Sequence, residues 1–310
     1  MSGVSSERQF AAQGMVIAAA VLWSTSGLFI QLIDWHPVVI AGSRGFLAAA
    51  FLAVVRSFFP PQKPAAANAT SAFNVPLLVS AIAHALMVIT FVVANRLTAP
   101  ANAVLLQYSS PIWTALLAWR LLKEKPRWEN WLALVLVAAG LLIFFRGGLA
   151  SGALTGDLLG LTSGVFIAIH VVFLRMSKDN SPHDVLLACH ATAAIISIPF
   201  VFLYPPSLSL SNVIPMLYMG VIQQGIASLF IVYGIKRISA IKTMITCTIE
   251  PILNPVWVLL VFGQIPSLSA ISGGGIIVVA VLSSSVIGER RDAAQRRTAA
   301  LGKLQAGRAG

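Results

Sequence analysis

Charged residues are scarce in this 310-residue chain. Asp, Glu, Lys and Arg together make up 10% of it, whereas a soluble protein contains about 25%. Hydrophobic residues make up 57%, and the mean hydropathy is +0.86. No polar stretch is long enough to form a water-soluble domain. The composition therefore predicts an all-α polytopic membrane protein.

Cysteine and catalytic signatures are also scarce. The two cysteines, Cys189 and Cys247, both lie in apolar segments, which excludes a disulfide framework and indicates inert buried thiols. The sequence contains no H-E-x-x-H, no G-x-S-x-G and no phosphate-binding loop motif. We therefore expect neither an enzyme nor an ATP-driven pump, and no cofactor.

Long apolar runs fill most of the chain. A membrane-spanning helix needs about 20 mostly apolar residues. Ten segments qualify: 13–33, 37–59, 74–95, 100–121, 128–146, 156–175, 183–204, 212–235, 241–263 and 268–287. Within the sixth span, Gly160 and Gly164 form a G-x-x-x-G pattern that permits close helix packing.

Basic residues set the predicted orientation. With a cytosolic N-terminus, only Arg96 and Arg146 fall on the outer side and Arg44 falls within a span, while every other Lys and Arg falls on the inner side. This asymmetry follows the positive-inside rule and places both termini in the cytosol, with the chain in the cell inner membrane. Anionic lipid of the inner leaflet then accounts for the net charge of +11 without nucleic-acid binding.

An internal repeat is visible in two segments. Residues 109–126 align with 249–266, so that Pro111 meets Pro251, Glu124 meets Gln264, and Pro126 meets Pro266. The repeat unit has five spans, and an odd number of crossings leaves the second copy inverted, as in many secondary transporters. We expect repeats over 1–147 and 148–287, followed by a basic cytosolic tail over 288–310.

Three stretches resemble a known family. They are "LWSTSGLF" (22–29), "HPVVIAGSRGFLAAAFL" (36–52) and "NRLTAPANAVLLQYSSPIWTALLAWRLLKEKP" (95–126). The chain is similar over nearly its whole length to EamA-type exporters of the drug/metabolite transporter superfamily. The resemblance implies ten helices, cytosolic termini and a central cavity lined mainly by spans 1, 3, 4, 6, 8 and 9.

The chain departs from the family pattern at two positions. Ser110-Pro111 stands where the family often has Glu-Pro, and Gln264 stands where it often repeats the terminal Glu. The first departure leaves the cavity asymmetric in charge. The second suggests that Glu124 makes a local helix-end contact, and we expect Pro111 and Glu124 to be structural.

Glu250 is the most informative residue, since it lies near the middle of the ninth span. A charge there costs about 2.5–3.5 kcal/mol on insertion scales. It could bind a substrate ammonium or take up and release a coupling proton. The alternative is a structural carboxyl that accepts hydrogen bonds from a neighbouring helix.

Pro251 and Pro255 are expected to kink this span, because each lacks a backbone donor. Asn254 and Trp257 follow Glu250 by four and seven residues, which places all three on one helical face. Such a face suits a cavity wall, where the three side chains would contact substrate. The alternative is a packing kink with Trp257 facing lipid.

Other polar or aromatic residues within spans also need partners in a lipid environment. We expect each either to contact substrate or to join helices: Trp23 and Ser24 in span 1, His84 in span 3, Gln107 and Tyr108 in span 4, His170 in span 6 and Gln223 in span 8. The histidines show no metal-ligand spacing, so no metal site is expected.

Arg44 could snorkel outward from the second span or could hold a substrate carboxylate. The structural role is favoured.

These features predict a secondary transporter that works by alternating access around a central cavity. The expected cargo is a small polar or zwitterionic metabolite, with amino acids as the leading class and export as the direction. A proton gradient or facilitated exchange would drive it. The alternatives are uptake of a vitamin, quaternary amine or nucleoside-type compound, and a non-transporting membrane sensor or enzyme subunit.

Overall fold

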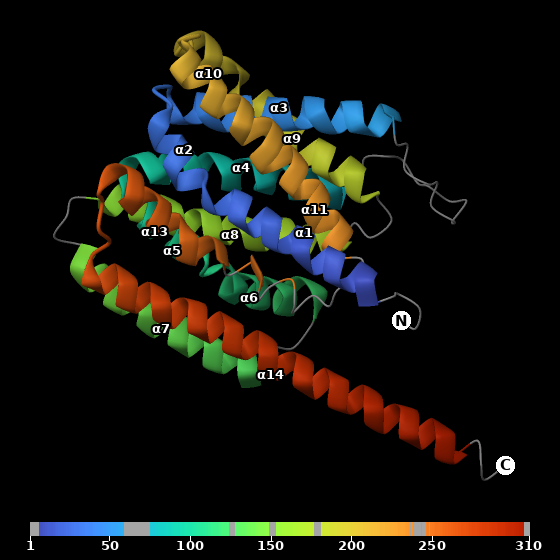
Figure 1. Cartoon of the computed structure of the whole chain (residues 1–310). Helices are drawn as coiled ribbons and strands as arrows, with labels where there is room; N and C mark the ends of the chain where they lie inside the picture. The colour runs from blue at the N-terminus through green and yellow to red at the C-terminus, as the bar shows by residue number, and fades with distance from the viewer. Residues whose placement is uncertain are drawn as a thin grey trace.

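The chain folds into packed helices in this computed structural model (Figure 1). The structure describes residues 6–58, 75–123, 128–148, 153–176 and 181–306, except 236, 238–242, 244, 245 and 248. The described elements of the first half are α1 (Ser6–Ser24), α2 (Ser26–Leu32), α3 (Pro37–Phe58), α4 (Val75–Leu97), α5 (Pro100–Gln107), α6 (Ser110–Leu122) and α7 (Trp128–Gly148). Those of the second half are α8 (Leu154–Met176), α9 (Pro182–Leu203), α10 (Leu210–Leu217), the π-helix η1 (Tyr218–Ile226), α11 (Ala227–Ile235), α13 (Ile249–Phe262) and α14 (Leu268–Ala306).

These helices confirm the all-α fold class and correspond to the predicted spans, except that most of 241–248, at the start of the ninth, lies outside the described residues. Within the described part, seven helices are long and apolar enough to cross a membrane, and two shorter apolar helices span Trp131–Ile143 and Ile249–Phe262. The predicted fourth span is the pair α5 and α6. It is split because the chain turns at Tyr108 and Ser109, directly before Pro111 in the first turn of α6.

The contacts between helices follow a repeat of five spans: where two spans pack together, the spans five positions further along the chain also pack together, counting on from span 10 to span 1. Span 5 packs on span 10 (α7 on α14), and span 2 packs on span 7 (α3 on α9). The contact of span 3 with span 6 (α4 on α8) recurs as span 8 on span 1 (α11 on α1). The contact of span 4 with span 6 (α6 on α8) recurs as span 9 on span 1 (α13 on α1). This pattern favours two halves related by a pseudo-two-fold axis.

Small residues allow the closest contacts. A Cβ at Gly160 would lie 3.3 Å from Ala103, and one at Gly164 would lie 2.9 Å from the carbonyl oxygen of Gln107. The G-x-x-x-G pattern therefore brings α8 against the α5–α6 break, as its sequence indicated.

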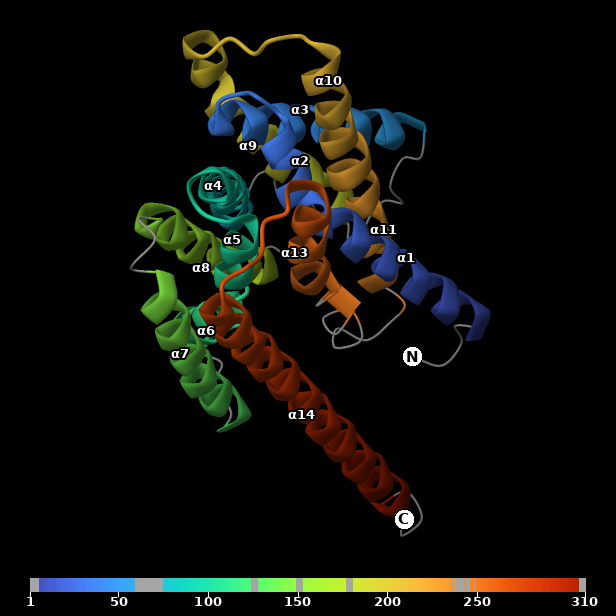
Figure 2. The same cartoon turned by 60° about the vertical axis from the view of Figure 1, so that its left-hand side comes forward.

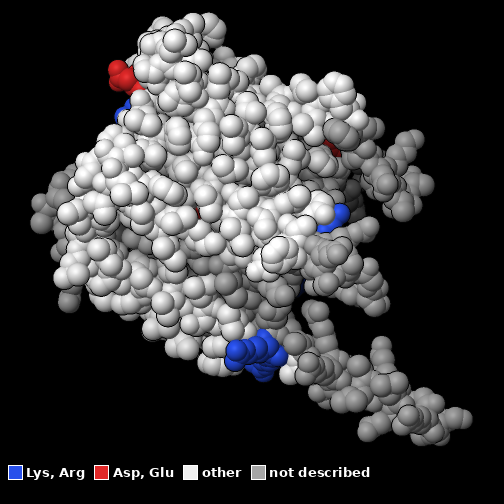
Figure 3. Space-filling model, in the orientation of Figure 1, with Lys and Arg blue, Asp and Glu red and all other residues white. Residues whose placement is uncertain are grey.

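The surface shown in Figure 3 is mostly uncharged, with isolated basic and acidic groups. Large apolar side chains such as Phe46, Phe202 and Leu260 are exposed, as expected of a lipid-facing surface. The first turn of α1 and the last turn of α14 lie toward the same end of the bundle (Figures 1 and 2). Helix α14 continues without a break into the predicted tail, as far as Ala306. Glu124 lies outside the described residues.

Candidate functional site

The first span breaks at Thr25, in the middle of its serine- and threonine-rich stretch. The hydroxyls of Ser24, Thr25 and Ser26 each donate to the carbonyl oxygen three residues earlier, at 2.6, 2.7 and 2.5 Å. Such local bonds compete with the helical ladder, which explains why α1 ends here and α2 begins. Trp23 lies half-buried at this break.

The π-helix η1 of span 8 makes hydrogen bonds to this break. The Gln223 amide donates to the Leu22 carbonyl at 3.3 Å and to the Thr25 hydroxyl at 3.1 Å. The Tyr218 hydroxyl also lies 3.1 Å from that of Thr25, and its ring stacks on Phe29. Gln223 therefore joins two helices, which is one of the two roles expected of it, and π-helical segments occur frequently at functional sites.

The predicted face of α13 points toward the same break. The Trp257 indole donates to the Ser24 hydroxyl at 2.9 Å, so the tryptophan does not simply face lipid. Asn254 is fully buried against Gly27, and neither its amide nitrogen nor its oxygen has a partner among the described residues. Together with Glu250, these residues form the shared face that their spacing predicted.

Glu250 meets Tyr108 at the break between α5 and α6. The Tyr108 hydroxyl lies 3.2 Å from the Glu250 carboxylate and 2.8 Å from the carbonyl oxygen of Cys247. Pro251 follows Cys247 by four residues and has no N–H, so it leaves that carbonyl without its helical donor. Tyr108 therefore replaces the bond that Pro251 removes, while Pro255 lies inside α13.

The hydroxyl of Tyr108 has a single hydrogen to share between these two acceptors. When Glu250 is ionised, it can only accept, and it competes with Cys247 for that hydrogen. When Glu250 is protonated, it can donate to the tyrosine oxygen while the tyrosine donates to Cys247. The hydrogen-bond arrangement is thus different for the two protonation states of Glu250.

Gln107 points away from this group. Its amide donates to the Ser163 hydroxyl of α8 at 2.5 Å, and Ser163 in turn lies 3.3 Å from the Met87 carbonyl. Gln107 therefore joins spans 4 and 6 and does not contact Glu250.

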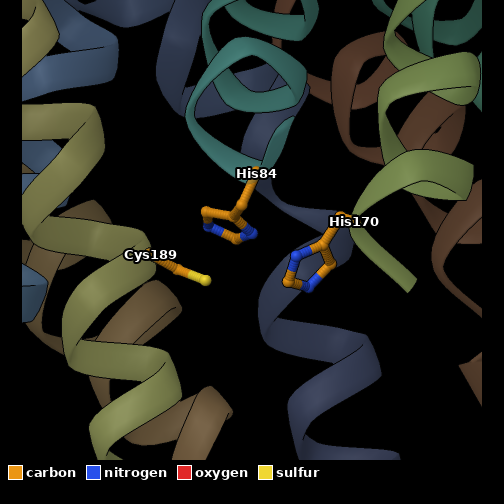
Figure 4. A group of neighbouring side chains, drawn as sticks. All are labelled: His84, His170 and Cys189. Carbon is orange, nitrogen blue, oxygen red and sulfur yellow. The ribbon is translucent and has the colours of Figure 1, made fainter. Parts of the chain in front are cut away.

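A second polar group lies between α4, α8 and α9 (Figure 4). The rings of His84 and His170 are 5.1 Å apart, and those of His84 and His190 are 5.3 Å apart. Ligating atoms of His84, His170 and Cys189 lie within 4.8 Å of one another. Ser80 bonds to Nδ1 of His170 through its hydroxyl at 2.9 Å and its carbonyl at 3.0 Å.

Arg44 belongs to the same region. It is 5% exposed, and its Nε and Nη1 have no hydrogen-bond partner among the described residues. Its positive charge acts on His84, His190 and Glu250. Imidazole and thiol side chains can hold a soft metal ion, but an unpaired guanidinium beside them opposes a cation. The arrangement is better suited to an anion.

Several residues at these sites were not selected from the sequence. Thr25 and Tyr218 complete the contact between spans 1 and 8, and Cys189 and His190 adjoin His84. Tyr218 could have been selected from the sequence, because a tyrosine hydroxyl within a membrane span needs a hydrogen-bond partner. No sequence pattern indicated that His84, His170, Cys189 and His190 lie together, since they come from three separate helices.

The described groove of about 850 Å³ lies elsewhere, between α3, α9 and α10. Apolar side chains such as Phe46, Leu47 and Ile198 line it. None of the polar side chains described above lines it, and its two serines are Ser43 and Ser197.

Comparisons with known proteins agree with this architecture. The EamA-like transporter family matches the chain twice, over residues 11–146 and 154–286. The "Pseudopaline exporter CntI" of Pseudomonas aeruginosa is 29% identical over 214 residues, which are 67% of this chain and 74% of that protein. An "Uncharacterized transporter" of Archaeoglobus fulgidus is 24% identical and covers 87% of this chain and 94% of its own length.

A solved crystal structure shares the fold, with a TM-score of 0.63 and 18% identity, covering 90% of this chain and 98% of the other. The family match extends over both halves and most of the residues. This chain belongs to the EamA-like transporter family, within the drug/metabolite transporter superfamily, and is a multi-pass membrane transporter.

Proposed function

We propose that this transporter exports a small zwitterionic metabolite, with amino acids as the leading class, by alternating access between its two halves. The observation that supports this most directly is the carboxylate of Glu250, which lies in the first turn of α13 and accepts a hydrogen bond from Tyr108 at the break of span 4. No described cation forms an ion pair with it. An ionised carboxylate within a membrane span is costly without a cation, and a substrate ammonium would compensate it.

Neighbouring side chains would complete the contact with substrate. Asn254 offers an unpartnered buried amide, and Trp257 adjoins it on the same face. Trp23 would contribute apolar surface from span 1. These contacts remain proposals, as does the inverted relation of residues 1–147 and 148–287 that alternating access requires.

Proton coupling follows from the Tyr108 arrangement. An ammonium would bind ionised Glu250, and a proton would replace the ammonium when Glu250 donates to Tyr108. Because the two occupants exclude each other, a proton entering from one side can exchange for a substrate leaving by that side. Facilitated exchange without protons would leave transport insensitive to the pH gradient.

The direction rests on a relative. The Pseudomonas aeruginosa relative is named as an exporter, and this likeness favours export.

Counterflow in proteoliposomes tests the proposal. Vesicles containing the purified protein would be loaded with one unlabelled amino acid at a time and exposed to the same amino acid carrying a radiolabel. We expect transient accumulation for at least one amino acid, absent from protein-free vesicles. No accumulation with any of the twenty amino acids would contradict the proposed class. A wider panel of vitamins, quaternary amines and nucleosides would then be tested.

A further inference from the structure

Arg44 is a buried cation without a described counter-ion. The guanidinium remains charged in proteins, and burying such a charge unpaired costs several kcal/mol. Its Nε and Nη1 point to no acceptor among the described residues. A bound anion could accept hydrogen bonds from both of these nitrogens.

The nearby histidines also have ring nitrogens without a partner. Nε2 of His84 and Nε2 of His190 are buried and unpartnered in the described part of the chain. The two rings lie 5.3 Å apart, nearly perpendicular, and come from α4 and α9. A neutral imidazole with hydrogen on Nε2 can donate there. Three helices, α3, α4 and α9, therefore direct unpartnered side-chain nitrogens into one region, and each of them can donate to an anion.

The helix packing fixes these donors in place. Helix α3 approaches α9 closely, because a Cβ at Gly42 would overlap Ser197 and one at Gly45 would lie 2.9 Å from the His190 carbonyl oxygen. Arg44 lies between these two glycines in the sequence. The backbone that presents the guanidinium is thus held close to the backbone that presents His190.

Glu250 provides the opposite charge at a distance. Arg44 and Glu250 act on each other electrostatically, yet they form no ion pair, and Glu250 is bonded to Tyr108 instead. A molecule with a carboxylate and an ammonium would neutralise both residues at once. A metal ion would not fit beside Arg44 in the same way, because the guanidinium would repel its positive charge.

We propose that Arg44, with His84 and His190, forms an oxyanion subsite that binds the carboxylate of the transported zwitterion. This inference rests on the proposed function and names the second charged group of its substrate. A planar guanidinium binds a carboxylate through two parallel hydrogen bonds, which gives orientation as well as affinity. The substrate would then lie with its ammonium at Glu250 and its carboxylate at Arg44.

Chemical analogues test the subsite. Counterflow would be measured for each amino acid, for its amide, which lacks the carboxylate, and for its des-amino acid, which lacks the ammonium. We expect wild-type protein to prefer the acid over the amide by at least about 10-fold, as a charge-assisted hydrogen bond contributes about 1.5–3 kcal/mol. In Arg44→Gln this preference should disappear. Arg56→Gln is the matched control, because Arg56 pairs with Asp184 at the surface.

Two transport results would overturn the inference. Equal exchange of acids and amides by wild-type protein would do so while leaving the proposed function intact. Retention of the full preference in Arg44→Gln would also do so. If neither acids nor amides are exchanged, the proposed function fails, and the subsite is then judged by binding alone.

Binding is measured on the purified protein in detergent, with potassium acetate as the probe at constant ionic strength. We expect a saturable rise in melting temperature for wild type and Arg56→Gln, and none for Arg44→Gln. Identical shifts in all three proteins would overturn the subsite.

Stability separates this role from a structural one. Without any added anion, Arg44→Gln should melt at the same temperature as wild type or higher, because it removes an unpaired buried charge. A structural arginine predicts a lower melting temperature. Should the glutamine variant fail to fold, that result itself favours the structural role. Arg44→Lys, which keeps the charge but not the paired donors, then tests whether acetate binding weakens.

Discussion

Glu250 and Tyr108 show how one proline shapes the chemistry of a neighbouring side chain. Pro251 deprives the Cys247 carbonyl of its donor, and the Tyr108 hydroxyl supplies a replacement while also contacting the carboxylate. The tyrosine hydroxyl is therefore shared between the Cys247 carbonyl and the Glu250 carboxylate. Two substitutions separate these roles.

Glu250→Gln keeps the shape and the hydrogen-bonding capacity of the side chain but removes its charge. We expect counterflow to fall roughly 10- to 100-fold, since a hydrogen bond to a charged group contributes about 1.5–3 kcal/mol. Any residual flux should no longer depend on pH between about 5.5 and 8. The amount of inserted protein, measured by immunoblot, should not change. Wild-type flux at every pH would exclude Glu250 from substrate binding and coupling.

Tyr108→Phe removes the hydroxyl and with it the hydrogen bond to the Cys247 carbonyl, which Pro251 already deprives of its helical donor. We expect the free energy of unfolding to fall by about 1–3 kcal/mol, seen as a lower melting temperature in detergent. Tyr204→Phe is the control, because Tyr204 is 49% exposed at the end of α9. Equal melting temperatures for both variants would show that the Tyr108 hydroxyl does not stabilise the start of α13.

At the scale of helices, the sequence located the spans but not their breaks. Apolar run length is enough to find a span, because lipid accepts only helices with their backbone bonds satisfied. A break depends on hydrogen bonds across the fold: the turn at Thr25 is held by Gln223, almost two hundred residues later. A kink of the ninth span stays a prediction, which rests on proline acting within its own helix, as at Pro255 inside α13.

The close contact between α2 and α13 gives a prediction for Gly27. A Cβ at this position would lie 2.7 Å from the Asn254 oxygen and 2.8 Å from Cβ of Pro100. We expect Gly27→Ala to destabilise the protein by about 1–3 kcal/mol through overpacking. The matched control is Gly14→Ala in α1, where no atom lies within 4 Å and a helix gains from alanine. A melting temperature for Gly27→Ala as high as for Gly14→Ala would contradict the packing.

At the scale of the whole molecule, an odd repeat unit determines the architecture. Five spans and their copy must run in opposite senses, and the recurrence of helix pairs after a shift of five spans agrees with this. The sequence suggested such a repeat through the alignment of residues 109–126 with 249–266, and Pro111 and Pro251 both lie in the first turn of a helix, α6 and α13. The histidine group could not be anticipated, because only the packing of three helices brings it together.

The central claim is that Glu250 faces an aqueous pathway between the two halves. It is tested most directly by a cysteine at position 250 in a protein whose Cys189 and Cys247 are replaced by serine, labelled with a membrane-impermeant cationic thiol reagent. Leu260→Cys is the control, because Leu260 is 71% exposed on α13 where lipid is expected. Our account predicts reaction at position 250 from at least one side of the membrane and none at position 260. Protection of position 250 from both sides would contradict it.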